Sequence, residues 1–176
     1  MNEQEISRAV RAVLEQLKGR APGQENARGM TDQNAPAMTL EAANALIEKV
    51  KAKAAAMGVD AVVAVSDAAG RPVSVQCMDG AYIASFDIAL NKTYTSAGLK
   101  MSTAELSRLA QPGQSLYGIQ FTNSGKIVIF GGGEVLEKNN TIVGALGVSG
   151  GTAAQDTALG AYGKKVFEEE MLSGSE

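Results

Sequence analysis

Residues 61–77 have the sequence AVVAVSDAAGRPVSVQC, and this stretch indicates the fold class. Residues 61–66 form a continuous apolar run, which is typical of a buried strand. The small and polar residues 67–72 favour a turn, and residues 73–77 return as a second strand, so the stretch predicts a β-hairpin. Strands that are joined by such short turns pair antiparallel.

Helices and further strands are predicted on both sides of this hairpin. Thr39 is a predicted N-cap, and its helix ends at Met57, before Gly58. The remaining pattern predicts helices over 81–99, 102–110 and 152–172, strands over 116–121, 126–130 and 142–148, and a turn over 137–141. The predicted fold is therefore α+β, with an antiparallel sheet flanked by helices.

The first 38 residues differ in composition from the rest. Residues 1–17 predict an amphipathic helix with one apolar stripe, made of Ile6, Val10, Val13, Leu14 and Leu17. A helix of this length is marginal alone in water, so the stripe needs a partner surface. Residues 18–38 are rich in glycine, proline and small polar residues and predict a flexible linker, which leaves 39–176 as the domain.

The composition excludes several functions. The 176 residues contain no histidine, which rules out a Ser-His-Asp triad, a Cys-His dyad and histidine-ligated zinc or haem iron. A net charge of −3 argues against nucleic-acid binding. A single cysteine allows no internal disulfide and fits a reducing cytoplasm. No apolar run is long enough to predict a membrane span, and the N-terminus lacks the pattern of a secretion signal.

Two glycine motifs are candidates for ligand binding. Gly131, Gly132 and Gly133 follow a predicted strand, where glycine allows a backbone to approach a ligand closely. The alternative is a turn with special dihedral angles. Ser149, Gly150 and Gly151 precede the last predicted helix, where backbone amides favour an anion, or alternatively only cap the helix. Asp156 lies in the first turn of that helix and stabilises it.

Polar residues also gather at the start of the helix predicted over 81–99. Asp79 and Gly80 precede it, and Ser85 and Lys92 lie seven residues apart on roughly the same face. Lys92 would pair with a carboxylate or phosphate of a ligand. The alternative is an ordinary solvated helix surface.

Four side chains are candidate ligands for a soft metal or haem iron. Cys77 and Met78 end a predicted strand and offer sulfur, whereas Tyr82 and Tyr94 offer phenol oxygens. The alternatives are a small buried hydrophobic residue for Cys77 and ordinary packing for the tyrosines.

Five segments together resemble the GlcG/HbpS-like family, which includes the C-terminal domain of PduO. They are VVAVSDAAG, MDGAY, SFDIALNKTYTSAGLKMST, IVIFGGG and VGALGVSGGTAAQD, and the resemblance extends from about Leu40 to Phe167. It implies a profilin-like α+β fold, a homo-oligomer and a site for haem or a corrinoid near these motifs. Haem-binding members use a histidine near the first domain helix, so iron bound by this chain would require another donor.

The N-terminal segment is similar to the encapsulation peptides of bacterial microcompartments. This similarity implies a shell or cargo protein as partner and a place inside a microcompartment in the cytoplasm. The apolar stripe on a flexible tether agrees with docking into a groove of another protein. The alternative is a helix that packs on its own domain or at an oligomer interface.

These observations favour a microcompartment-associated accessory protein with a domain that binds a small molecule or cofactor. The resemblance attaches no established reaction to the chain. One alternative is an enzyme acting on a small pathway metabolite, with Lys92 supplying positive charge and Asp79 or Asp67 acting as base. Another is a non-catalytic oligomeric adaptor that multiplies weak N-terminal helices by avidity.

Overall fold

The structure, a computed structural model, describes residues 37–171. The predicted helix 1–17 and nearly all of the linker 18–38 lie outside these residues. The described elements are α2 (Leu40–Ala56), β1 (Val62–Asp67), β2 (Pro72–Cys77), α3 (Ser85–Leu99), α4 (Thr103–Leu109), β3 (Gly133–Lys138), β4 (Thr141–Ser149) and α5 (Ala153–Val166). Two short 3-10 helices precede β3, at Ile119–Phe121 and Asn123–Gly125, and one π-helical turn, Phe167–Met171, follows α5.

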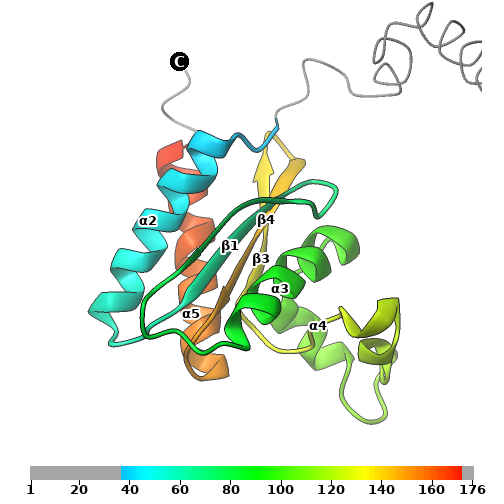
Figure 1. Ribbon diagram of the computed structural model, residues 1–176. Coiled ribbons are helices and arrows are strands. Elements are labelled where there is room, and N and C mark those ends of the chain that lie inside the picture. Colours follow the sequence, from blue (N-terminus) through cyan, green and yellow to red (C-terminus); the bar gives the residue numbers. More distant parts are fainter. Residues whose placement is uncertain (1–36, 172–176) are drawn as a thin grey trace, which may run out of the picture. The chain divides into compact units, whose positions relative to one another are not determined.

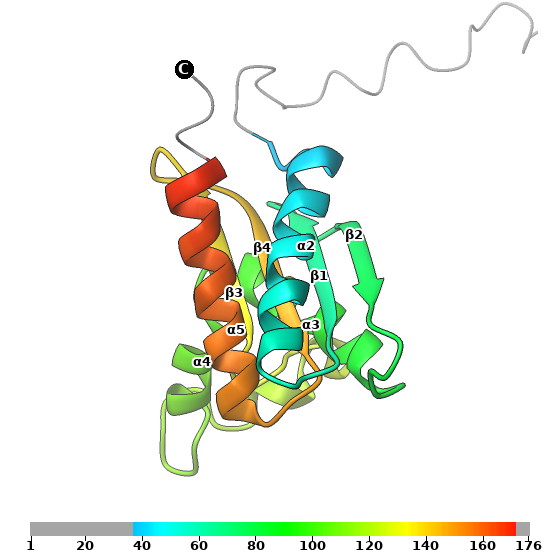
Figure 2. The same ribbon diagram turned by 90° about the vertical axis from the view of Figure 1, so that its left-hand side faces the viewer.

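The four strands form one antiparallel sheet in the order β2-β1-β4-β3 (Figures 1 and 2). β1 pairs with β2 through the predicted hairpin, and its other edge pairs with β4 from Val62 opposite Ser149 to Asp67 opposite Gly144. The turn between β3 and β4 places Asn139 and Asn140 at φ values of 52° and 59°, which asparagine tolerates. The predicted α+β class and antiparallel sheet are confirmed.

Helices cover both faces of the sheet. α2 and α5 lie side by side on one face, and α3 lies on the other (Figures 1 and 2). Side chains along β1 point alternately to the two faces of the sheet. Val63 and Val65 join the core under α2 and α5, whereas Val62 and Ala64 face α3.

Glycines in two strands allow α3 to lie very close to the sheet. Gly133 of β3 and Gly147 of β4 are directly opposite each other. A Cβ atom on Gly147 would overlap the carbonyl oxygen of Ala89 in α3, and one on Gly133 would come within 2.8 Å of the hydroxyl of Ser96. This face is therefore packed through backbone contact rather than through large side chains.

Two predicted strands are wrong. Residues 126–130 form no strand, because Ile127 and Val128 are buried against α3, and the amide of Val128 donates to the Thr95 hydroxyl at 3.0 Å. The strand before β4 begins instead at Gly133. The region predicted as a strand over 116–121 contains the 3-10 helix Ile119–Phe121. Within residues 37–171, no helix has the length and apolar character needed to cross a membrane.

Candidate functional site

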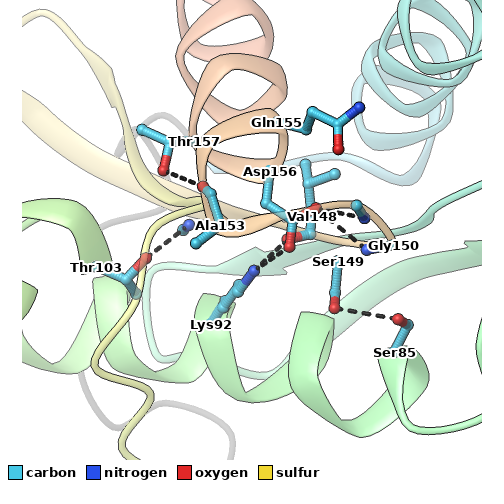
Figure 3. A network of polar contacts seen from close by, with 12 residues as sticks. Ser85, Lys92, Thr103, Val148, Ser149, Gly150, Ala153, Gln155, Asp156 and Thr157 are labelled. Atoms are coloured by element: carbon cyan, nitrogen blue, oxygen red, sulfur yellow. Dashed lines mark hydrogen bonds and ion pairs between the residues drawn. The ribbon is translucent and has the colours of Figure 1, made fainter. Parts of the chain in front are cut away.

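The predicted motifs converge where β4 ends and α5 begins (Figure 3). Lys92 comes from α3, and Gly150 comes from the turn between β4 and α5. Gly151 follows in the same turn, and Gly132, before β3, lies close to the Lys92 ammonium. Ser149 reaches back to α3, where its hydroxyl lies 3.2 Å from the hydroxyl of Ser85. Segments distant in the sequence are thus joined by one polar network.

Lys92 is the centre of this network and has no exposed side-chain surface. Its Nζ donates to Oδ2 of Asp156 at 2.8 Å and to the carbonyl oxygen of Val148 at 2.6 Å. The ring of Phe130 lies over the ammonium, 4.8 Å from Nζ to the ring centroid. Lys92 therefore pairs with a carboxylate of its own chain, not with the ligand carboxylate or phosphate that the sequence predicts. Because its side chain is buried, it does not lie on a solvated helix surface either.

The electrostatics of Lys92 reflect two opposed effects. Burial away from water disfavours the ammonium and lowers the pKa of Lys92 below its usual range. The hydrogen bond and the charge of Asp156 act in the other direction. Because Asp156 is only 2% exposed, each charge depends on the other for compensation.

The turn before α5 has its amides satisfied within the chain. Oδ1 of Asp156 accepts from the amides of Gly150 at 3.1 Å and Gly151 at 2.9 Å. Thr152 and Gln155 form a capping box, in which the Thr152 amide donates to Oε1 of Gln155 at 3.0 Å. Side chains of the chain itself therefore cap this turn, in agreement with the alternative that the motif caps the helix.

The three glycines of the triplet are packed against protein atoms. A Cβ on Gly131 would overlap the hydroxyl of Thr157, and one on Gly132 would lie 2.7 Å from Nζ of Lys92. The amide of Gly133 donates to the Thr103 hydroxyl at 2.9 Å. The triplet thus holds α5, α3 and α4 close together and supports the Lys92 network.

A pocket of about 410 Å³ opens beside the capped turn. Three predicted site residues, Gly80, Gly150 and Gly151, line it. Asp60 and Tyr82 bring a carboxylate and a phenol to the same pocket. Its volume is within the range of small-ligand sites.

Apolar side chains that follow the pocket residue Gly80 in the sequence are exposed. Tyr82 is 72% exposed and Ile83 97% in the segment just before α3, and Phe86 in its first turn is 45% exposed. Cys77, a free thiol, is exposed at the end of β2, a few residues earlier. This segment therefore offers both donor atoms and apolar surface to a bound molecule.

The other two candidate metal donors are already engaged. Sδ of Met78 accepts from the amide of Ala61 at 3.3 Å, and the Tyr94 hydroxyl accepts from Nδ2 of Asn123 at 3.0 Å. Among residues 37–171, no cluster of three or more His, Cys, Asp and Glu side chains is arranged for a metal ion. Any metal held here would depend on single donors.

The residues named for an enzyme are not brought together. Asp67 lies at the far end of the β1–β2 hairpin from Asp79, because Val62 pairs with Cys77 and the chain turns after Asp67. Asp67 binds its own turn, accepting from the Arg71 side chain at 2.8 Å. Asp79 is exposed, whereas Lys92 is buried.

Asp60 and Gln155 also line the pocket, and no sequence motif singles them out as site residues. Gly80 and Gly150 approach Asp60 so closely that a Cβ on either would overlap it. This juxtaposition depends on the register of β1 with β4, which no local pattern specifies. The only local signal for Asp60 is an acidic residue between a helix-ending glycine and a buried strand.

The fold and this site define a class of small α+β proteins in which one antiparallel sheet is covered on both faces and a glycine-lined pocket opens at its end. The family described as haem degrading protein HbpS-like matches residues 38–164, and the chain belongs to this family. A 15.0 kDa protein from the dhaT–dhaS intergenic region of Citrobacter freundii is 45% identical over 132 residues, covering 75% of this chain and 93% of the relative.

Two further comparisons concern PduO. The corrinoid adenosyltransferase PduO of Salmonella typhimurium is 38% identical over 104 residues, which cover 59% of this chain and only 31% of PduO. The chain thus spans about a third of that enzyme. A crystal structure of a PduOC–haem complex has a TM-score of 0.71 and 32% identity, and the match covers 74% of this chain and 94% of the other.

Proposed function

We propose that this chain is a microcompartment-associated accessory protein whose domain binds a tetrapyrrole, either haem or a corrinoid. The observation that supports this most is its similarity, at 32% identity, to the domain that forms the PduOC–haem complex. Membership of the HbpS-like family supports the same class of ligand. The adenosyltransferase activity of PduO is not assigned to this chain, since the match covers only 31% of that enzyme.

The residues at the pocket suit a tetrapyrrole bound at the surface. The macrocycle is flat and apolar, and the exposed side chains of Ile83 and Phe86 provide apolar contact. Iron accepts phenolate and thiolate ligands as well as imidazole. Tyr82 lines the pocket and Cys77 is exposed nearby in the chain, so these two residues would hold the metal in the absence of histidine.

When bound, the tetrapyrrole would supply a redox-active metal. The residues of the chain would fix where the tetrapyrrole lies. The Lys92–Asp156 pair fixes Gly150 and Gly151 at the pocket wall. Asp60 adds a carboxylate acceptor for polar substituents of the ligand. Of the predicted site residues, Gly80, Gly150 and Gly151 are thus proposed as contacts, while Lys92 and the triplet act as support.

Titration of the full chain with haemin and, separately, with a cobalamin tests the proposal. A saturable shift of the Soret band or of the corrin bands is expected with one of the two. A spectrum that changes only in proportion to added ligand with both would contradict tetrapyrrole binding. The comparison also separates haem from corrinoid.

The microcompartment role rests on residues 1–17. Fusion of residues 1–20 to a fluorescent protein should give puncta in cells that contain microcompartment shells. A matched fusion with Val10→Asp and Leu14→Asp interrupts the apolar stripe and should be diffuse. Diffuse fluorescence of the unmodified fusion in cells with intact shells would contradict encapsulation.

The protein is also proposed to be a homo-oligomer. Large apolar side chains are exposed outside the pocket, including Phe121 at 83% and Tyr117 at 64%. Burial of such side chains against a second copy would remove apolar surface from water. A second copy of the chain is the partner that the family resemblance implies.

A further inference from the structure

A second pocket, of about 310 Å³, lies at the other end of the β1–β2 hairpin from the site above. Three segments form it: the turn after β1, the last turns of α3 and the segment before β3. Ala68, Leu99 and Ile127 give it apolar walls, and Tyr94 and Asn123 bring polar atoms. Its volume is at the low end for ligand sites, which restricts it to a compact molecule.

Gly98 is the feature that distinguishes this pocket. It lies in α3, where glycine costs about 1 kcal/mol relative to alanine. Among the glycines that the structure describes, it alone has both an ordinary φ and no atom within 4 Å of a built Cβ. Neither backbone conformation nor close packing requires this glycine, and its missing side chain leaves the pocket open.

Tyr94 presents a hydrogen-bond donor to the pocket. Its oxygen accepts from Nδ2 of Asn123 at 3.0 Å, which leaves the phenol proton to donate. Asn123 and Ser124 adopt left-handed φ values of 50° and 57°, as Asn139 and Asn140 do in the β3–β4 turn. The turn places the Asn123 amide beside the Tyr94 hydroxyl.

The charges around this pocket are mainly positive. Nζ of Lys126 lies 5.7 Å from the centroid of the Tyr94 ring, and the exposed Lys100 follows Leu99. The adjacent acidic residue, Asp67, is paired with Arg71 at 2.8 Å. A ligand with a negative end is therefore favoured over a cation.

We propose that this pocket binds a compact carboxylate with a short apolar body. The body packs against Leu99 and Ile127 in the space left by Gly98. The carboxylate accepts a hydrogen bond from the Tyr94 hydroxyl and is attracted by the positive charge of Lys126. This proposal is independent of tetrapyrrole binding, which concerns the pocket at the start of α3.

The test is a titration of the ¹⁵N-labelled full chain with isobutyrate, followed by NMR. Saturable shifts are expected at the amides of Ala69, Gly98 and Asn123. Isobutyramide, which is neutral, should bind more weakly, and isobutylamine should not bind. Absence of saturable shifts at these amides, or equal binding of the amine, would overturn the proposal.

Two variants locate the binding. Gly98→Leu fills the pocket and should abolish the isobutyrate shifts, whereas Ala52→Leu adds similar bulk on the exposed side of α2 and should preserve them. Tyr94→Phe should weaken binding about 10-fold, because it removes the charge-assisted hydrogen bond. Isobutyrate binding by Gly98→Leu with wild-type affinity would show that the pocket is not the site.

Discussion

Lys92 shows how one buried charge organises several elements. Its ammonium joins α3 to the end of β4 through Val148 and to the first turn of α5 through Asp156. The other oxygen of Asp156 holds the turn at Gly150 and Gly151. The geometry of the pocket wall thus depends on an ion pair that lies behind it.

Replacing Lys92 with methionine should destabilise the fold by about 3–5 kcal/mol, because it leaves the Asp156 carboxylate buried without a counter-charge. Urea denaturation of the full chain measures this change. Adding Asp156→Asn to Lys92→Met should recover part of the loss, since the uncompensated charge is then removed.

Lys165→Met is the matched control for that change. Lys165 pairs with Glu169 at 3.8 Å, and their side chains are 69% and 64% exposed. Its loss should cost no more than about 1 kcal/mol. Equal effects at Lys92 and Lys165 would show that the buried pair is not structurally important.

Glu134 provides a pH-dependent prediction. Burial in β3 raises the pKa of its carboxyl; Lys164 opposes this shift and Glu168 adds to it. Above the raised pKa, the folded state carries a disfavoured carboxylate. As pH falls through the folded pKa, the folded state takes up a proton before the unfolded state does, so its stability rises.

Glu134→Gln should therefore stabilise the protein at neutral pH, with a gain that disappears at pH values below both pKa values. Denaturation curves over a pH series measure it. Glu137→Gln, an exposed change on the same strand, is the control. A gain that persisted unchanged in acid would contradict this account.

The sequence predicted the polar residues of the site better than their partners. Lys92 and Asp156 stood out by their positions in two helices. Their pairing spans 64 residues and depends on how α3 and α5 approach the end of β4. Asp60 lacked a comparable signal, because its neighbours Gly80 and Gly150 are defined by strand register.

At the scale of elements, the close approach of α3 to the sheet is the main determinant. Gly147→Ala should destabilise the fold by about 1–3 kcal/mol, since the new methyl group would overlap the Ala89 carbonyl oxygen. Thermal denaturation of the full chain would show this loss as a lower Tm.

Gly98→Ala on α3 is the matched control, because its methyl group enters open space. It should stabilise the fold by about 1 kcal/mol. Similar effects of the two changes would contradict the proposed packing.

The same elements explain where sequence patterns succeeded and failed. The run at 61–66 was correctly assigned as a strand because sheet and helices bury it on both faces. The run at 126–130 is also mainly apolar, but only its Ile127 and Val128 are buried, and they lie outside the sheet. An apolar run alone does not distinguish the two cases. β3 was missed because it begins in the glycine triplet, which resembles a turn.

At the scale of the whole molecule, the exposed apolar side chains predict self-association. Sedimentation equilibrium should give a mass that is a multiple of 18.2 kDa. Phe121→Asp should reduce that mass, because a carboxylate is costly in an apolar interface. Thr122→Asp is a control with the same charge on an exposed neighbouring residue. A monomer at all concentrations would contradict the prediction.

The central claim is that this histidine-free chain binds a tetrapyrrole at the start of α3. The most direct test is a haemin titration of the full chain beside the double variant Cys77→Ser, Tyr82→Phe, followed at the Soret band. We expect a saturable, red-shifted band for the wild type that the double variant loses, while Tyr117→Phe retains it. An unchanged band in the double variant would contradict the assigned donors, and no saturable band in the wild type, with haemin or cobalamin, would contradict the claim itself.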